Sequence, residues 1–156
     1  MYRDQIIEAL RRAGLQNEVL EESGMEWVVA GDVQGVPVTV ALTDESPNRL
    51  RMAATVCPVS EIDGVPAGHP DDDDPVALVE ILDALLDLNT EIDPVAVGIS
   101  HVDPENPTLQ ARTTLRVVDL QAAEVEAALS GLMGSLGEIR QTLVAYAPAV
   151  AQAGNA

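Results

Sequence analysis

Hydrophobic and polar side chains alternate with a period of two over four stretches of this chain: residues 36–43, 49–57, 95–100 and 109–118. This period is typical of a β-strand with one buried face. A short apolar run at residues 27–30 precedes the first stretch and adds a fifth strand. Neighbouring strands are separated by short segments rich in Gly, Pro, Asp and Asn, which predict turns and antiparallel pairing. These turns fall at residues 31–35, 44–48 and 103–107.

Three other segments have helical spacing. Residues 3–15 place their apolar side chains on one face and stop at Gly14. A central helix begins at Pro75 and continues to about Ile92, and a last helix spans about residues 120–146. The predicted order is α-β-β-β-α-β-β-α. We therefore expect an α+β fold with a five-stranded, mostly antiparallel sheet and helices packed on one face.

The last helix carries an apolar seam with a mean spacing of 3.5 residues. Its members are Val125, Leu129, Leu132, Leu136, Ile139, Leu143 and Tyr146. Gly131, Gly134 and Gly137 interrupt this helix, and each costs about 1 kcal/mol relative to Ala in a helix interior. They indicate close approach of another backbone or a local weak point. Packing on the sheet of the same chain explains the seam, but the total apolar and flat helical surface exceeds what one small sheet covers.

That surplus predicts a homodimer, because two-fold pairing would cover it. Its interface is expected at the glycine face of the last helix or at the polar face of the sheet. The 156 residues form one domain over residues 1–147, followed by a flexible tail at 148–156. No apolar run approaches the ~20 residues of a membrane span, and the N-terminus lacks the apolar segment of a signal peptide. We expect a cytoplasmic protein.

Charge narrows the choice of partners. The chain has 26 Asp and Glu against eight Arg and no Lys, a net charge of -18. Such a surface repels nucleic acids and anionic membranes and attracts basic proteins, although the charge also serves solubility alone. On the central helix, an acidic stripe forms a predicted protein-binding surface at Glu80, Asp83, Asp87 and Glu91.

Half of the cations lie on the predicted sheet. Arg49, Arg51, Arg112 and Arg116 occupy polar-phase positions of two strands, where small residues leave the surface flat. Ordinary exposed positions that carry Arg would give the same pattern. The functional interpretation is a protein-docking platform with a basic rim on an acidic body.

Candidate catalytic and metal-binding residues are isolated in the sequence. The run Asp71–Asp74 lacks the alternating spacing of a calcium loop and is read as a solvated helix cap, with His69 nearby. His101 is in phase with the apolar side of its strand, so a capped or half-buried residue is expected. Cys57 shares the strand phase of Arg49 and Arg51, and a structural thiol is favoured over a nucleophile. We expect no enzyme activity, no metal and no cofactor.

The segment Leu85–Asn89 ends the central helix and is followed by a short turn, a two-stranded hairpin and a long amphipathic helix that ends near Ala147. Taken together, these features resemble the YbjN family and the related type III secretion chaperone-like fold. The resemblance covers almost the whole chain. It implies a small, acidic, dimeric protein that binds other proteins, and it brings no catalytic motif.

We therefore expect a non-enzymatic, chaperone-like module that acts as a homodimer. Its client is predicted to be a basic protein, such as a nucleic-acid-binding or DNA-processing protein, and no direct contact with nucleic acid or membrane is expected. The alternative is an acidic DNA-mimic regulator of a DNA-binding protein, which would use the acidic stripe in place of the sheet face.

Overall fold

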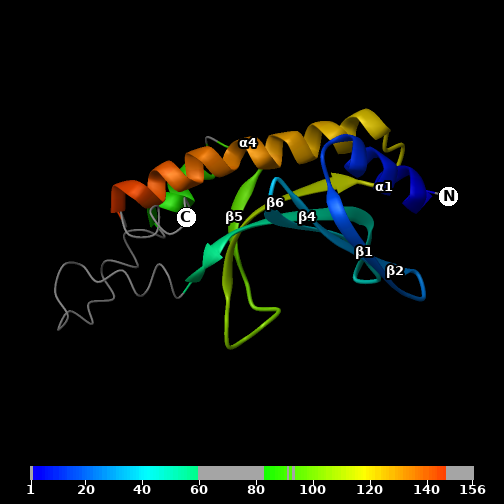
Figure 1. Ribbon diagram of the computed structural model, residues 1–156, viewed down its shortest axis with the longest axis horizontal. Helices are drawn as coiled ribbons and strands as arrows, with labels where there is room; N and C mark the ends of the chain where they lie inside the picture. The colour runs from blue at the N-terminus through cyan, green and yellow to red at the C-terminus, as the bar shows by residue number, and fades with distance from the viewer. Residues whose placement is uncertain (1, 60–82, 91, 93, 147–156) are drawn as a thin grey trace.

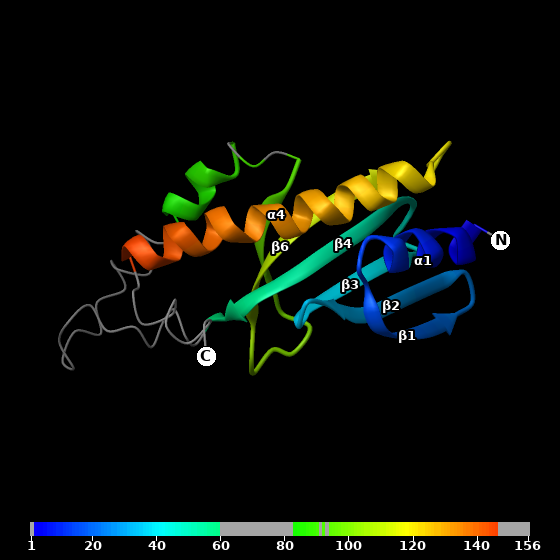
Figure 2. The same cartoon turned by 45° about the horizontal axis from the view of Figure 1, so that its top comes forward.

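The computed structural model describes residues 2–59, 83–90, 92 and 94–146. Six strands form one antiparallel sheet, in the order β1-β2-β3-β4-β6-β5. One long helix and one shorter helix lie over one face of this sheet (Figures 1 and 2). The elements are α1 (Tyr2–Arg12), β1 (Gln16–Ser23), β2 (Glu26–Val33), β3 (Val36–Thr43), β4 (Ser46–Pro58), β5 (Ala96–Ser100), β6 (Thr108–Arg116) and α4 (Ala122–Tyr146).

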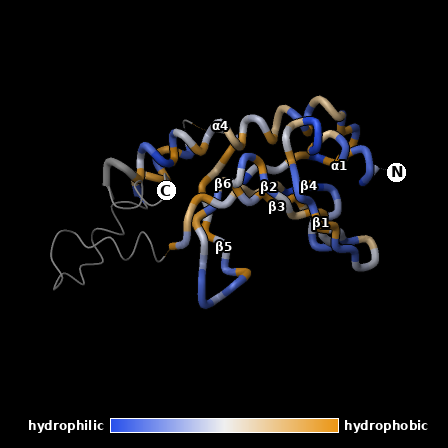
Figure 3. The backbone as a smooth tube through the Cα atoms, in the orientation of Figure 1, coloured by the Kyte–Doolittle hydropathy of each residue, from blue (hydrophilic) through white to orange (hydrophobic). Residues whose placement is uncertain are grey.

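The core lies between the sheet and the helices. The seam of α4 faces the sheet, and its described members Val125, Leu129, Leu132, Leu136, Ile139 and Leu143 are all buried. They meet the apolar side of the strands, where Val40, Leu50 and Leu109 are fully buried. Along α4 the hydropathy changes with each turn, as expected of a helix with one covered face (Figure 3). The described residues of the seam are therefore buried against the sheet of the same chain.

The predicted α+β class and antiparallel sheet are confirmed, but the sheet has six strands and not five. The missed strand is β1, which has no period-two pattern because nearly all of its residues are exposed. An edge strand can be held by backbone hydrogen bonds alone, so its sequence need not alternate. The usable signal was Gly24, whose φ of 64° closes a two-residue hairpin between Ser23 and Glu26.

The predicted element order was wrong for the same reason, since four strands precede the central segment. The predicted turn at residues 31–35 was also too long. β2 continues to Val33, and the turn consists of Gln34 and Gly35, with φ values of 51° and 81°. Two positive φ values mark a type I′ hairpin, which favours glycine. The predicted stop at Gly14 is confirmed by its φ of 112°.

The central helix is described only over residues 83–88. Leu85 is buried in the core, whereas Leu86 is 63% exposed, so the apolar face is narrower here than predicted. The start of this helix at Asp71–Asp74 and Pro75 lies outside the described residues, as does the predicted tail at 148–156.

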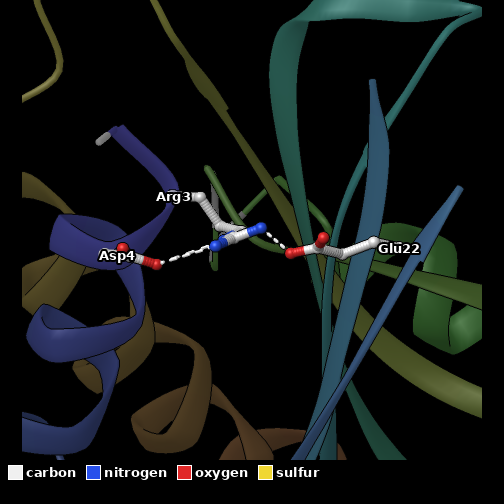
Figure 4. A network of polar contacts seen from close by, with 3 residues as sticks. All are labelled: Arg3, Asp4 and Glu22. Atoms are coloured by element: carbon white, nitrogen blue, oxygen red, sulfur yellow. Dashed lines mark hydrogen bonds and ion pairs between the residues drawn. The ribbon is translucent and has the colours of Figure 1, made fainter. Parts of the chain in front are cut away.

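Polar contacts attach α1 to the sheet edge. Arg3 pairs with Asp4 on its own helix at 3.1 Å and with Glu22 on β1 (Figure 4). Arg11 also pairs with Glu18 of β1, and this contact lowers the pKa of the Glu18 carboxyl and raises the pKa of Arg11. Among the described residues, no helix is long and apolar enough to span a membrane.

Candidate functional site

The face of the sheet turned away from α4 carries no covering element within the described part of the chain (Figures 1 and 2). We call it the open face. It is formed by β2, β3, β4 and β6. The β5–β6 hairpin loop projects beside it and helps to enclose a cavity of about 790 Å³. Thr39, Ala41 and Ala53 belong to its lining, so the floor is made of short side chains.

The register of β4 and β6 brings the four predicted arginines together on this face. Arg49 lies directly opposite Arg116, and Arg51 lies opposite Thr114. Arg112 lies opposite Ala53, which makes it the diagonal neighbour of Arg51. All four side chains are exposed.

Arg112 is held in place by the edge of the sheet. Its Nη2 donates to the carbonyl oxygen of Ile99 at 2.7 Å, and its Nε donates to Oε1 of Gln110 at 3.2 Å. The guanidinium lies over Gly98, where an added Cβ would come within 2.7 Å of Nη1. Glycine at this position therefore allows Arg112 to lie flat against β5.

The arginines of the open face differ from those of α1 in their partners. Arg3, Arg11 and Arg12 each form an ion pair with a carboxylate. Within residues 2–59 and the other described ranges, no carboxylate lies within ion-pairing distance of the four open-face arginines. Among the residues that the structure describes, Arg51 donates only to the hydroxyl of Ser46, at 3.0 Å.

Two carboxylates of the sheet and its loops accept hydrogen bonds within turns. Asp103, which lines the cavity, accepts hydrogen bonds from the backbone of Glu105 and the side chain of Asn106. Asp32 accepts from Asn17 and from the backbone of Gly35 at the far side of the sheet. The open face thus has a hollow lined by Arg51 and Arg112, and it carries four arginines that have no carboxylate partner among the described residues.

Comparison with known proteins identifies the family of this chain. The model of the YbjN family, described as "Putative bacterial sensory transduction regulator", matches residues 2–103, which is more than half of the chain. The chain belongs to the YbjN family. This confirms the resemblance drawn from the sequence. The match includes the helix end at Leu85–Asn89, while α4 lies beyond it.

Solved structures extend the comparison to the rest of the YbjN chain. A chain in the structure of the HopA1-SchA chaperone-effector complex is similar, with a TM-score of 0.56 and 14% sequence identity. The alignment covers 90% of this chain and 93% of the other. At this identity the likeness shows a shared fold. The comparison with curated proteins gives no match.

Two other predicted surfaces of this YbjN member are placed only in part. Asp83 and Asp87 of the acidic stripe are exposed, but Glu80 and Glu91 lie outside the described residues. Gly131, Gly134 and Gly137 are exposed on α4, and nothing lies within 4 Å of an added Cβ at any of them. The close backbone approach that the glycines indicated is therefore absent from the described part of this chain.

Two expectations about the isolated chemical residues were wrong. A β-bulge between Thr55 and Cys57 shifts the register, so Cys57 is buried on the helix side, away from Arg49 and Arg51. His101 is exposed in the hairpin loop and is not half-buried. His69 and Asp71–Asp74 lie outside the described residues. In the described ranges, no three His, Cys, Asp or Glu side chains gather where they could hold a metal ion.

Proposed function

We propose that this YbjN member is a non-catalytic, chaperone-like protein-binding module and that its open face is the docking surface. One observation carries the proposal: a sheet face, hollowed beside Arg51 and Arg112, with four arginines that make no ion pair with any described carboxylate. Family membership and the fold shared with a chain of a chaperone-effector complex support it.

The client that fits the whole surface is a basic protein, such as a nucleic-acid-binding or DNA-processing one. A net charge of -18 steers basic proteins towards the chain over distances of about a Debye length, ~8 Å at physiological ionic strength. This long-range electrostatic attraction sets the rate at which the client and the chain meet. The open face then contacts one segment of the client at short range.

The same proposal includes a homodimer. Of the two predicted interfaces, the exposed glycine face of α4 is the better one. A two-fold interface sets the same patch of both copies together, so pairing through the open face would confront two sets of unpaired arginines. The DNA-mimic alternative depends on the acidic stripe, of which the described residues include only Asp83 and Asp87. We propose the open face as the docking site because its four arginines make no ion pair with the described carboxylates.

Site-specific photo-cross-linking tests this assignment. A photoreactive phenylalanine is placed at Thr39, which is exposed and lines the cavity, and in a control at Gln141, which is exposed on α4. Clients that co-purify with the protein in its source cell should cross-link from position 39 and not from position 141. Clients that cross-link from position 141 alone, or equally from both, would place the docking surface elsewhere.

A further inference from the structure

We infer that the open face binds an extended segment of a partner protein in which Asp or Glu side chains stand two residues apart. This inference rests on the proposed function and names the chemistry of the segment that docks. It applies to a short stretch of the client and is compatible with a client that is basic overall.

Two arginines of the open face stand opposite each other without a described carboxylate to neutralise them. Arg49 and Arg116 are a directly opposed cross-strand pair, and like charges in that position destabilise a sheet. The chain pairs its α1 arginines with carboxylates but leaves this pair without any among the described residues. A carboxylate supplied from outside would relieve the repulsion and form charge-assisted hydrogen bonds.

The spacing of the arginines matches that of the side chains of an extended peptide. Arg49 and Arg51 are two residues apart on one strand, which separates their backbone positions by about 6.7 Å. An extended peptide repeats its side chains on one face at the same interval. Carboxylates at positions i and i+2 of the peptide can therefore meet both arginines at once, and Arg112 lies diagonally beyond Arg51.

The shape of the open face also suits an extended peptide. Short side chains at Thr39, Ala41 and Ala53 leave room for a peptide backbone to lie on the sheet. Arg112 is already oriented by Ile99 and Gln110, so little of its rotamer entropy remains to be lost on binding. The hydrogens on its Nη1 find no acceptor among the described residues.

The net charge decides between a peptide and a nucleic acid. Duplex DNA presents about one negative charge per 1.7 Å and would be repelled by a body of charge -18 before it reached four arginines. Two or three carboxylates within a neutral or basic partner meet far less repulsion. The local cations therefore favour a short acidic segment of a protein.

The test uses the full chain and the synthetic peptide Thr-Glu-Thr-Glu-Thr-Glu-Thr, with a control peptide in which Gln replaces each Glu. Binding is followed by NMR of the arginine Nε–Hε groups. The signals of Arg49, Arg51, Arg112 and Arg116 should shift with the Glu peptide, and that of Arg140 should not. Arg49→Gln/Arg51→Gln should weaken binding about 2- to 30-fold, as expected for the loss of two exposed ion pairs.

The matched control is Arg140→Gln, which removes an exposed arginine from α4 and should leave the affinity unchanged. Equal binding of the Gln peptide, or equal shifts at Arg140, would overturn the inference. So would a single-stranded dT12 oligonucleotide that binds the same four arginines more tightly than the peptide, since it would identify a phosphate ligand.

The outcome is separable from that of the proposed function. Client cross-linking from position 39 that is unchanged in Arg49→Gln/Arg51→Gln would overturn the acidic segment and leave the docking surface in place. Absence of cross-linking from position 39 in the otherwise unaltered chain would remove the docking surface itself.

Discussion

At the scale of single residues, Arg49 and Arg116 place two like charges side by side, which destabilises the sheet. Each side chain is exposed, and the two stand opposite each other across β4 and β6. A sheet gains from opposite charges or from aromatic and β-branched pairs at such positions and loses from like charges. Their presence is understandable if the face is selected for binding and not for stability.

A double-mutant cycle measures this conflict. Arg49→Gln, Arg116→Gln and the double variant are unfolded with urea, and the cycle removes the effect of changing the net charge. We expect an unfavourable coupling of about 0.2–1 kcal/mol between the two arginines. A favourable coupling would mean that the pair stabilises the sheet, and it would weaken the argument for an external anion.

Gly98 gives a second residue-scale prediction. Gly98→Ala places a methyl group within 2.7 Å of Arg112 Nη1 and should displace the flexible guanidinium without disturbing the strand. Peptide affinity should fall to that of Arg112→Gln, while the urea midpoint changes little. A large loss of stability in Gly98→Ala would instead show that the glycine is needed by the backbone.

At the scale of elements, α4 combines a buried seam with an exposed glycine face. Gly134 is exposed and has open space around it, so Gly134→Ala should stabilise the monomer by about 0.5–1 kcal/mol through helix propensity. If the glycine face forms the dimer, the same change should also weaken dimerisation, which sedimentation would detect. No stabilisation and no change in association would indicate that α4 is constrained by another contact.

The ion pair between Arg11 of α1 and Glu18 of β1 should make the stability of the fold depend on pH. Because the pKa of Glu18 is lowered in the folded state by the hydrogen bond from Arg11, its contribution to stability is present above the ordinary glutamate pKa of about 4.3. It is lost as the pH falls through the folded value. Glu18→Gln should therefore flatten the stability curve only in this acid range, as seen by thermal unfolding at a series of pH values. Identical curves for both proteins would show that the contact is not formed in solution.

The elements differ in how far the sequence predicts them. Alternation is enough for β3, β4 and β6, since each has one buried face, and it also assigns the four arginines to the opposite side. β1 escapes this reasoning because an exposed edge strand needs no alternation. Alternation also assigns Cys57 to the wrong face, because a single-residue bulge reverses the phase of the strand before it. The concavity of the open face depends on how the loop between β5 and β6 projects beside the sheet, and the alternation of the two strands does not encode that direction.

At the scale of the whole molecule, charge is distributed unevenly. The net charge is -18, yet half of the arginines lie on one sheet face that no described element covers. Such an arrangement attracts a basic client from a distance and offers a local site for carboxylates on contact. The proposed homodimer is checked by light scattering at micromolar concentration, where about twice the 16.4 kDa of one chain is expected. A mass near one chain would contradict it.

The most direct test of the central claim, that the open face is the docking surface, is the affinity of a purified client for two matched variants. Thr39→Trp fills the floor of the cavity with a side chain that suits a strand, and Gln141→Trp adds the same bulk to the exposed side of α4. By titration calorimetry, Thr39→Trp should weaken binding by about tenfold or more, equivalent to ~1.4 kcal/mol, with Gln141→Trp near the original affinity. Equal affinity of the two variants, or a loss confined to Gln141→Trp, would contradict the account.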